Sequence, residues 1–229
     1  MEKSAVNLRD VSRFKILYCW FMANMPEVAV GVYNRQGYID YDHNIRMDRG
    51  ERAFILSICF CYYMRLGTFE SRQKYLEMVE KLMGYPQKYM SKVLENEQLD
   101  YLSRMQRPKG CALNLALREN VFTCLVCLMN KLPIIIVGMP GCSKSLAIRL
   151  LVSNLRGRNS HDEFFRKLPE LQLFPYQGGE ACSSEGVLKV FERAENNKRH
   201  GSIPCILFDE IGLAELSVHN PLKVLHAKL

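Results

Sequence analysis

Apolar residues recur every three or four positions through most of the first 130 residues, which is the period of an amphipathic helix. After a cap at Asn7, this spacing predicts a helix that ends near Met25. Four more helices are predicted, one from about Glu51 and the others over residues 70–83, 87–105 and 113–130. Residues 26–50 hold glycines and several tyrosines without a period, which predicts a linker there.

From residue 131 onward, short apolar runs alternate with helical patterns. Residues 132–137, 171–176 and 203–208 are predicted strands, and Pro175 indicates a sheet edge or a strand end. Helices are expected over residues 145–155, after a capping box from Ser160 to Glu163, after Ser183 or Ser184, and from Asn220-Pro221 onward. Such alternation predicts an α/β fold with a parallel sheet and flanking helices.

The composition limits the class of protein. The chain has 229 residues, 48% hydrophobic and 24% charged, which suits one or two globular domains. Its net charge of +7 would permit a nucleic-acid partner, but the basic residues are scattered, so nucleic-acid binding is not expected as the main role. The start lacks an apolar signal, and no apolar run reaches the roughly 20 residues of a membrane span. We therefore expect a cytoplasmic protein without a transmembrane segment.

Nine cysteines raise the question of a zinc site. Cys124 and Cys127 form a CxxC pair, but it lies in an apolar helical pattern and no second pair follows. Structural zinc usually takes four ligands. The alternative, reduced thiols packed as small apolar groups, is favoured, and no zinc site is expected.

Eight residues between the first predicted strand and the next helix match a phosphate-binding loop with one deviant position, Gly138-Met139-Pro140-Gly141-Cys142-Ser143-Lys144-Ser145. In such a loop the backbone N–H groups, continuing into the helix at Leu146, converge on an anion. Lys144 would reach the β- and γ-phosphates of ATP, and the Ser145 hydroxyl would bind Mg²⁺. The alternative is a glycine- and serine-rich turn that happens to contain Lys-Ser.

That alternative gains weight from Ser143, which stands where glycine is usual. If this position needs a left-handed backbone, a Cβ there costs roughly 1–2 kcal/mol.

Asp209 and Glu210 follow the last predicted strand directly. Ligands of open α/β sheets bind at the carboxyl ends of the strands. Asp209 would hold Mg²⁺ opposite Ser145, and Glu210 would orient and deprotonate the water that attacks the γ-phosphate. The alternative is a solvated acidic strand end. Together with the loop, in this order, the pair predicts a P-loop ATPase.

The loop and the Asp209-Glu210 pair resemble the Walker A and Walker B motifs of AAA+ ATPases. Two longer runs are more specific: residues 137–147, with serine in place of glycine, and residues 208–215 (FDEIGLAE), followed by NPLKVLH from Asn220. Both look like an AAA+ module of the mysterin-like giant ring-finger E3 ubiquitin ligases. The segment from Ala112 to Phe122 is similar as well.

This resemblance implies a division of the chain. Residues 1–25 would be the lid helix of a preceding AAA+ module, 26–50 a linker, 51–130 a helical connector, and 131–229 the N-terminal half of a nucleotide-binding core. The core would be incomplete at its C-terminal end. Arg9 would be sensor 2 of the preceding module, the alternative being a surface arginine. Partners would be other AAA+ modules of the same parent and, through that parent, the ubiquitin machinery.

Other functions stay open at this point. A linked-module mechanoenzyme of the midasin or dynein kind would use the same motifs without ubiquitin chemistry, although residues 212–215 argue against it. A nucleotide-binding scaffold without turnover is favoured by Ser143 and opposed by Glu210. No ring finger lies in these 229 residues, and we expect the isolated chain to bind ATP weakly and hydrolyse it negligibly.

Overall fold

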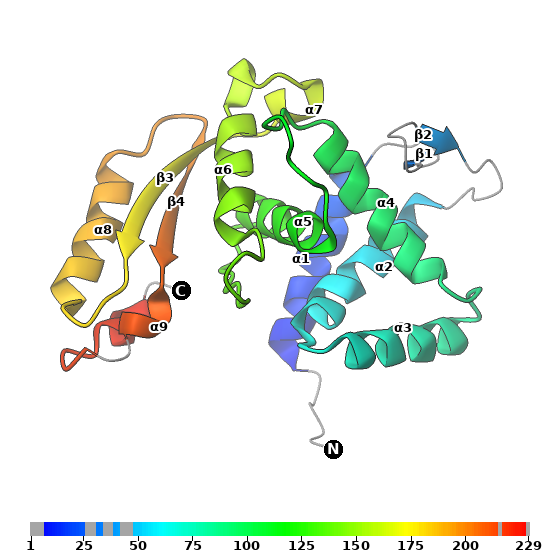
Figure 1. Ribbon diagram of the computed structural model, residues 1–229, viewed down its shortest axis with the longest axis horizontal. Coiled ribbons are helices and arrows are strands. Elements are labelled where there is room, and N and C mark those ends of the chain that lie inside the picture. The colour runs from blue at the N-terminus through cyan, green and yellow to red at the C-terminus, as the bar shows by residue number, and fades with distance from the viewer. Residues whose placement is uncertain (1–6, 26–30, 34–38, 42–47, 215–216, 228–229) are drawn as a thin grey trace. The chain divides into compact units, whose positions relative to one another are not determined.

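The computed structural model describes residues 7–25, 31–33, 39–41, 48–214 and 217–227. The chain forms two compact units, Met1–Ser103 and Arg104–Leu229. Within the described residues, the first unit is mostly helical and the second mixes helices with a small parallel sheet (Figure 1). The fold is therefore of mixed helix and strand, as the sequence pattern predicts.

The helices of the first unit agree with the sequence-based prediction. They are α1 (Leu8–Asn24), α2 (Arg49–Cys61), the 3-10 turn η1 (Tyr63–Arg65), α3 (Phe69–Met83) and α4 (Tyr89–Ser103). Two short strands, β1 (Gly31–Tyr33) and β2 (Ile39–Tyr41), pair antiparallel inside the segment predicted as a linker. Most of the other residues of that segment lie outside the described part of the chain.

Local signals in the sequence explain where these helices begin and end. The Asn7 side chain accepts a hydrogen bond from the backbone N–H of Asp10, and the Asp10 carboxylate accepts one from the N–H of Asn7, which completes a capping box. Helix α3 ends at Gly84, whose φ of 71° is in the left-handed region that glycine adopts without steric cost. The predicted cap at Asn7 and stop at Gly84 are thus confirmed.

Buried charges connect the helices of the first unit. The guanidinium of Arg52 on α2 binds the carboxylate of Glu97 on α4, with a closest N–O distance of 2.6 Å. The buried carboxylate of Glu80 on α3 accepts hydrogen bonds from the backbone N–H groups of Lys88 and Met90, at the start of α4. These contacts give each buried charge a partner, without which burial would cost several kcal/mol.

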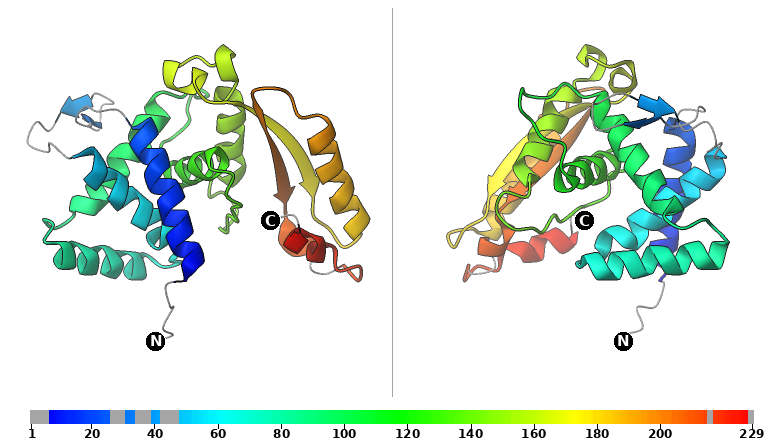
Figure 2. Two further views of the ribbon diagram at one scale, coloured as in Figure 1. Left: turned by 180° about the vertical axis from the view of Figure 1, so that it is seen from behind. Right: turned by 45° about the vertical axis from the view of Figure 1, so that its right-hand side comes forward.

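The second unit alternates helices and strands. Its elements are α5 (Leu115–Met129), α6 (Lys144–Asn154), the 3-10 turn η2 (Gly157–Asn159), α7 (Glu163–Arg166), β3 (Glu170–Gln177), α8 (Ser184–Asn196), β4 (Ser202–Asp209), α9 (Ile211–Ala214) and the 3-10 helix η3 (Pro221–Ala227). Strands β3 and β4 pair in parallel, from Glu170 opposite Ser202 to Gln177 opposite Asp209. Helix α8 forms the crossover that a parallel pair requires and lies beside the strands in both figures (Figure 2).

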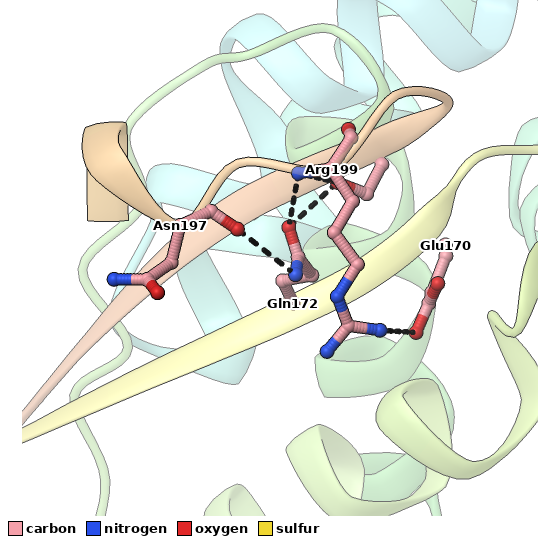
Figure 3. Close-up of polar contacts among 5 residues, drawn as sticks. Glu170, Gln172, Asn197 and Arg199 are labelled. Carbon is pink, nitrogen blue, oxygen red and sulfur yellow. Dashed lines mark hydrogen bonds and ion pairs between the residues drawn. The ribbon is translucent and has the colours of Figure 1, made fainter. Parts of the chain in front are cut away.

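A buried glutamine fixes the turn that leads into β4. The side-chain carbonyl of Gln172 on β3 accepts hydrogen bonds from the Arg199 backbone N–H and from the Ser202 hydroxyl, at 3.1 and 2.6 Å. Its amide donates to the backbone carbonyl of Asn197 at 3.3 Å, and the Arg199 guanidinium binds Glu170 (Figure 3). These bonds satisfy a buried polar group and hold the start of β4 in register with β3.

The predicted strand over residues 132–137 is wrong. No strand is present there, because none of the described strands runs beside this segment to accept and donate the backbone hydrogen bonds that a strand needs. Half-buried and exposed side chains still alternate along it, and Ile135 and Val137 are 76% and 90% exposed. The segment thus has the period of a strand without its pairing.

Two further predictions about helix ends need correction. Asp162, not Ser160, caps α7, because its carboxylate accepts from the N–H of Phe164 at 2.8 Å. The Ser160 hydroxyl instead accepts from the N–H of Arg156 at 3.0 Å. After Asn220 the chain forms the 3-10 helix η3 and not an α-helix. The predicted cap of α8 is confirmed at Ser183, whose side chain accepts from the N–H of Gly186.

Candidate functional site

The loop before α6 has the backbone shape that its sequence requires. Gly141 and Ser143 both have positive φ, 83° and 58°. The N–H of Cys142 donates to the carbonyl of Met139 at 3.3 Å, which closes a turn around Pro140 and Gly141. Helix α6 begins immediately afterwards at Lys144. Ser143 therefore has the left-handed backbone conformation in which a Cβ is expected to cost roughly 1–2 kcal/mol.

Lys144 lies back across the loop. Its ammonium donates to the carbonyls of Gly138 and Met139, at 2.6 and 2.9 Å. Ser145 and Leu146 follow in the first turn of α6, whose free N–H groups carry partial positive charge. A cation and a helix N-terminus on one short loop form an arrangement suited to an anion.

An anchor from α5 holds the loop from outside. The side-chain amide of Asn120 donates to the backbone carbonyl of Cys142 at 2.8 Å. The next residues of α5, Val121 and Phe122, are fully buried, so the helix is a fixed support. Sequence reasoning missed Asn120, and only its place in the segment of resemblance before the loop could have indicated it.

The acidic pair lies at the end of β4, as predicted. Asp209 and Glu210 are both exposed, and the Asp209 carboxylate accepts a hydrogen bond from the N–H of Glu210 at 3.0 Å. Glu210 has a φ of 50°, so the chain turns sharply between β4 and α9. Both acids therefore lie at the solvent-exposed end of the paired strands.

Two residues at the end of β3 contact this pair, and sequence reasoning missed both. The amide of Gln177 donates to the Glu210 carboxylate at 3.0 Å, and the N–H of Gly178 donates to the backbone carbonyl of Asp209 at 2.7 Å. A Cβ on Gly178 would lie 2.3 Å from the backbone carbonyl oxygen of Glu210, so only glycine fits there. No signal in the sequence indicated them, because the register that pairs Gln177 with Asp209 is a property of the folded sheet.

The loop and the acidic pair face the same end of the second unit. In Figures 1 and 2 the loop before α6 and the ends of β3 and β4 all lie toward the lower side of the view. Among the described contacts, no hydrogen bond or ion pair joins the loop to Asp209 or Glu210. The structure brings Lys144 to the loop and Gln177 to Glu210, and it leaves Ser145 and Asp209 exposed.

The exposed oxygens fit a hard cation. A serine hydroxyl and a carboxylate are oxygen donors of the kind that Mg²⁺ takes, with water and phosphate oxygens as its other ligands. Within the described residues, no three His, Cys, Asp or Glu side chains gather into a group that could hold a metal by themselves. A magnesium bound here would therefore depend on a phosphate ligand.

The buried thiols behave as apolar groups. Cys124 on α5 is 1% exposed, and burial, with Cys127 and Cys205 nearby, raises the pKa of its thiol to about 12. Burial also raises the pKa of the Cys205 thiol, to about 11. Thiols that stay protonated at neutral pH are poor metal ligands and poor nucleophiles.

Arg9 lies apart from this site in the chain. It is exposed on the first turn of α1 in the first unit, next to the capping residue Asp10. Its role as a sensor of another module stays a prediction.

Among the helices in the described ranges, none has both the length and the apolar composition needed to cross a membrane.

Comparison with known proteins supplies the family. The family model described as RNF213 AAA domain matches residues 110–229, just over half of the chain. The chain belongs to the RNF213 AAA domain family. This confirms the resemblance to mysterin-like ring-finger ligases that the motifs indicated.

Individual relatives of the RNF213 group match along the whole chain. It is 32% identical over 237 residues to the E3 ubiquitin-protein ligase rnf213-beta of Danio rerio, and 29% identical over 239 residues to the E3 ubiquitin-protein ligase RNF213 of Homo sapiens and to that of Mus musculus. All of this chain is covered in each case, but it spans only 4% of the length of these relatives. The ligase activity in their names belongs to those much longer proteins.

Proposed function

We propose that the second unit binds ATP with Mg²⁺ and is an ATP-hydrolysing AAA+ module of an RNF213-like E3 ubiquitin ligase. Lys144 and the N–H groups from Gly138 to Leu146 would bind the phosphates, while Ser145 and Asp209 would hold the metal. Bound Mg²⁺ would neutralise part of the phosphate charge. Glu210 would orient a water and accept its proton.

One observation carries this proposal. The loop reaches α6 through a left-handed residue, Ser143, and returns the ammonium of Lys144 across its own carbonyls. The left-handed residue alone is not specific, since Lys88 and Glu210 also have positive φ directly before a helix. The combination of a lysine ammonium, a glycine-rich loop and a helix N-terminus is what suits an anion. The family match over the same residues supports a nucleotide as the anion.

The first test is binding of a fluorescent ATP analogue to the 229-residue chain in the presence of Mg²⁺. We expect Lys144→Ala to weaken binding at least about tenfold, since it removes the cation that faces the phosphates. The measurement is the dissociation constant from a fluorescence titration. Removing Mg²⁺ with a chelator should weaken binding of the unmodified chain as well.

A matched control is Lys189→Ala. Lys189 is an exposed lysine of the same unit whose ammonium binds Glu185 at 2.6 Å on the outside of α8. It should leave the dissociation constant unchanged. Equal binding by the unmodified chain and by Lys144→Ala would contradict the proposal, because a nonspecific basic surface would then account for it.

A scaffold that binds ATP without turnover is the second candidate, and one contact favours it. Gln177 already donates to one carboxylate oxygen of Glu210, so the proposed base is engaged by a neighbour. Release of inorganic phosphate separates the two functions. Turnover that Glu210→Gln abolishes would support hydrolysis, whereas binding without phosphate release would support a scaffold or the need for the rest of a longer protein.

The wider role rests on the relatives and on the resemblance. Ubiquitin transfer follows from the names of the relatives and neighbouring AAA+ modules from the resemblance, and we include both in the proposal at that level. A cytoplasmic location is proposed from the sequence pattern, in which no apolar run is long enough to span a membrane. A mechanoenzyme of the midasin or dynein kind is less well supported, because the family model that matches is that of RNF213.

A further inference from the structure

The contact between Asn120 and the loop is not explained by the proposed roles of the loop residues. Asn120 is 22 residues before Cys142 in the chain, yet its amide donates to the Cys142 carbonyl at 2.8 Å. Helix α5 is fixed at its start by the Asn114 side chain, which accepts from the N–H of Leu117, and it buries Leu117, Val121 and Phe122 completely. The donor therefore sits on a rigid element while its acceptor is on an exposed loop.

The acceptor belongs to a peptide whose orientation matters. The carbonyl of Cys142 and the N–H of Ser143 are two ends of one planar unit, and no peptide bond of the described chain is cis. In a trans peptide the two groups point in opposite directions. Holding the carbonyl toward α5 therefore directs the Ser143 N–H away from α5. Reversing this peptide would turn a carbonyl oxygen toward any anion that the loop binds.

The hydrogen bond from Asn120 matters more with serine at position 143 than it would with glycine there. At a φ of 58° its Cβ disfavours the observed backbone, whereas glycine adopts positive and negative φ about equally. Its own carbonyl is already fixed, because it accepts the N–H of Ala147 at 2.9 Å as the first bond of α6. The peptide on its other side has the Asn120 amide as its support.

We propose that Asn120 is a positioning residue that holds the Cys142–Ser143 peptide in its anion-binding orientation and so compensates for serine in the place of glycine. This inference rests on the proposed nucleotide binding of the loop. It gives α5 a role that no loop residue performs, namely to hold the loop backbone from outside.

A double-mutant cycle tests the inference. Asn120→Ala in the Ser143 background should weaken binding of the fluorescent ATP analogue about tenfold, because the loop can then relax out of the left-handed conformation. In the Ser143→Gly background the same change should weaken binding less than about threefold, since glycine keeps that conformation accessible. We therefore expect Asn120→Ala to cost more binding free energy with serine at position 143 than with glycine there, which is a nonzero coupling energy between the two positions.

Two variants make the result specific. Asn130→Ala removes an amide of the same type from the end of the same helix, where it donates only within α5, to the carbonyl of Val126 at 2.8 Å. It should not change the dissociation constant. Asn120→Leu keeps the branched shape of the side chain without the donor, so it should match Asn120→Ala. Circular dichroism establishes that each variant is folded.

The outcomes separate this inference from the proposed function. If the unmodified chain binds, Lys144→Ala does not, and both Asn120 variants bind normally, the positioning role is overturned and nucleotide binding stands. Equal losses with Ser143 in place and in the Ser143→Gly background would also overturn it, because a merely structural role gives additive effects. If the unmodified chain and Lys144→Ala bind equally, nucleotide binding itself fails.

Discussion

Arg52 and Glu97 in the first unit are 5% and 0% exposed and bind each other, whereas Asp209 and Glu210 in the second unit are open to solvent. The first unit uses its charges to join helices, so each buried charge has a partner inside the fold. The second unit leaves its candidate residues accessible and supports them with uncharged groups, namely the amides of Asn120 and Gln177. Burial with a charged partner thus marks charges that serve the fold, and exposure with a fixed support marks charges available to a ligand.

The largest expected effect that tests this contrast comes from Glu97→Ala. Burial raises the pKa of the Glu97 carboxyl above its ordinary value, and Arg52 opposes that shift without cancelling it. Removing the acid leaves the Arg52 charge buried without its partner, which we expect to destabilise the first unit by about 3–5 kcal/mol. Urea unfolding followed by fluorescence measures this, because the one tryptophan, Trp20, packs against Tyr101 within this unit.

Two controls sharpen that measurement. Replacing both partners, Arg52→Met with Glu97→Leu, should recover most of the loss, since no unpaired charge then remains. Glu70→Ala removes an exposed acid that binds Lys74 on α3 and should change the free energy of unfolding far less. A double variant as unstable as Glu97→Ala would mean that packing and not charge pairing dominates this site.

How much the sequence predicts also differs between the two units. Helical periodicity and local caps predict α1 to α4, because a helix makes its backbone hydrogen bonds within itself. Local patterns could not establish whether residues 132–137 form a strand, because a strand depends on partners that are distant in sequence. Motif spacing indicated Lys144, Asp209 and the conformational demand on Ser143. Asn120 and Gln177 were not predicted as site residues, because their roles depend on tertiary contacts.

Buried thiols provide a case in which the two units should behave alike. Burial, together with Glu80, raises the pKa of Cys59 in the first unit from 9.0 to about 12, and burial raises that of Cys124 in the second to about 12. Because the folded thiol keeps its proton while the unfolded one releases it, stability present below pH 9 is lost as the pH rises toward 12. Each thiol should contribute a slope of up to about 1.4 kcal/mol per pH unit.

The free energy of unfolding from urea titrations at about pH 8 and about pH 10, on either side of the ordinary thiol pKa, measures this slope. Trp20 fluorescence assigns the result to the first unit, and there Cys59→Ala should show a shallower loss than the unmodified chain. Cys19→Ala, which changes an exposed thiol on α1, should not alter the slope. An unchanged slope for Cys59→Ala would mean that other groups cause the loss of unfolding free energy at high pH. The Cys59 thiol would then make no measurable contribution to it.

The smallest expected effect tests whether the second unit stores strain at its site. Ser143→Gly removes a Cβ from a residue with a φ of 58°, which should favour the bound form by about 1–2 kcal/mol. Glycine also adds flexibility to the free loop, which offsets about 0.5–1 kcal/mol of that gain. We therefore expect binding of the fluorescent ATP analogue to tighten by about threefold.

Gly141→Ala is the matched opposite of that change. A Cβ on Gly141 meets no atom within 4 Å, so its cost comes from the φ of 83° alone and should weaken binding. Ser143→Ala keeps the Cβ and should bind like the unmodified chain. If it binds as tightly as Ser143→Gly, the serine hydroxyl and not the backbone is what limits affinity.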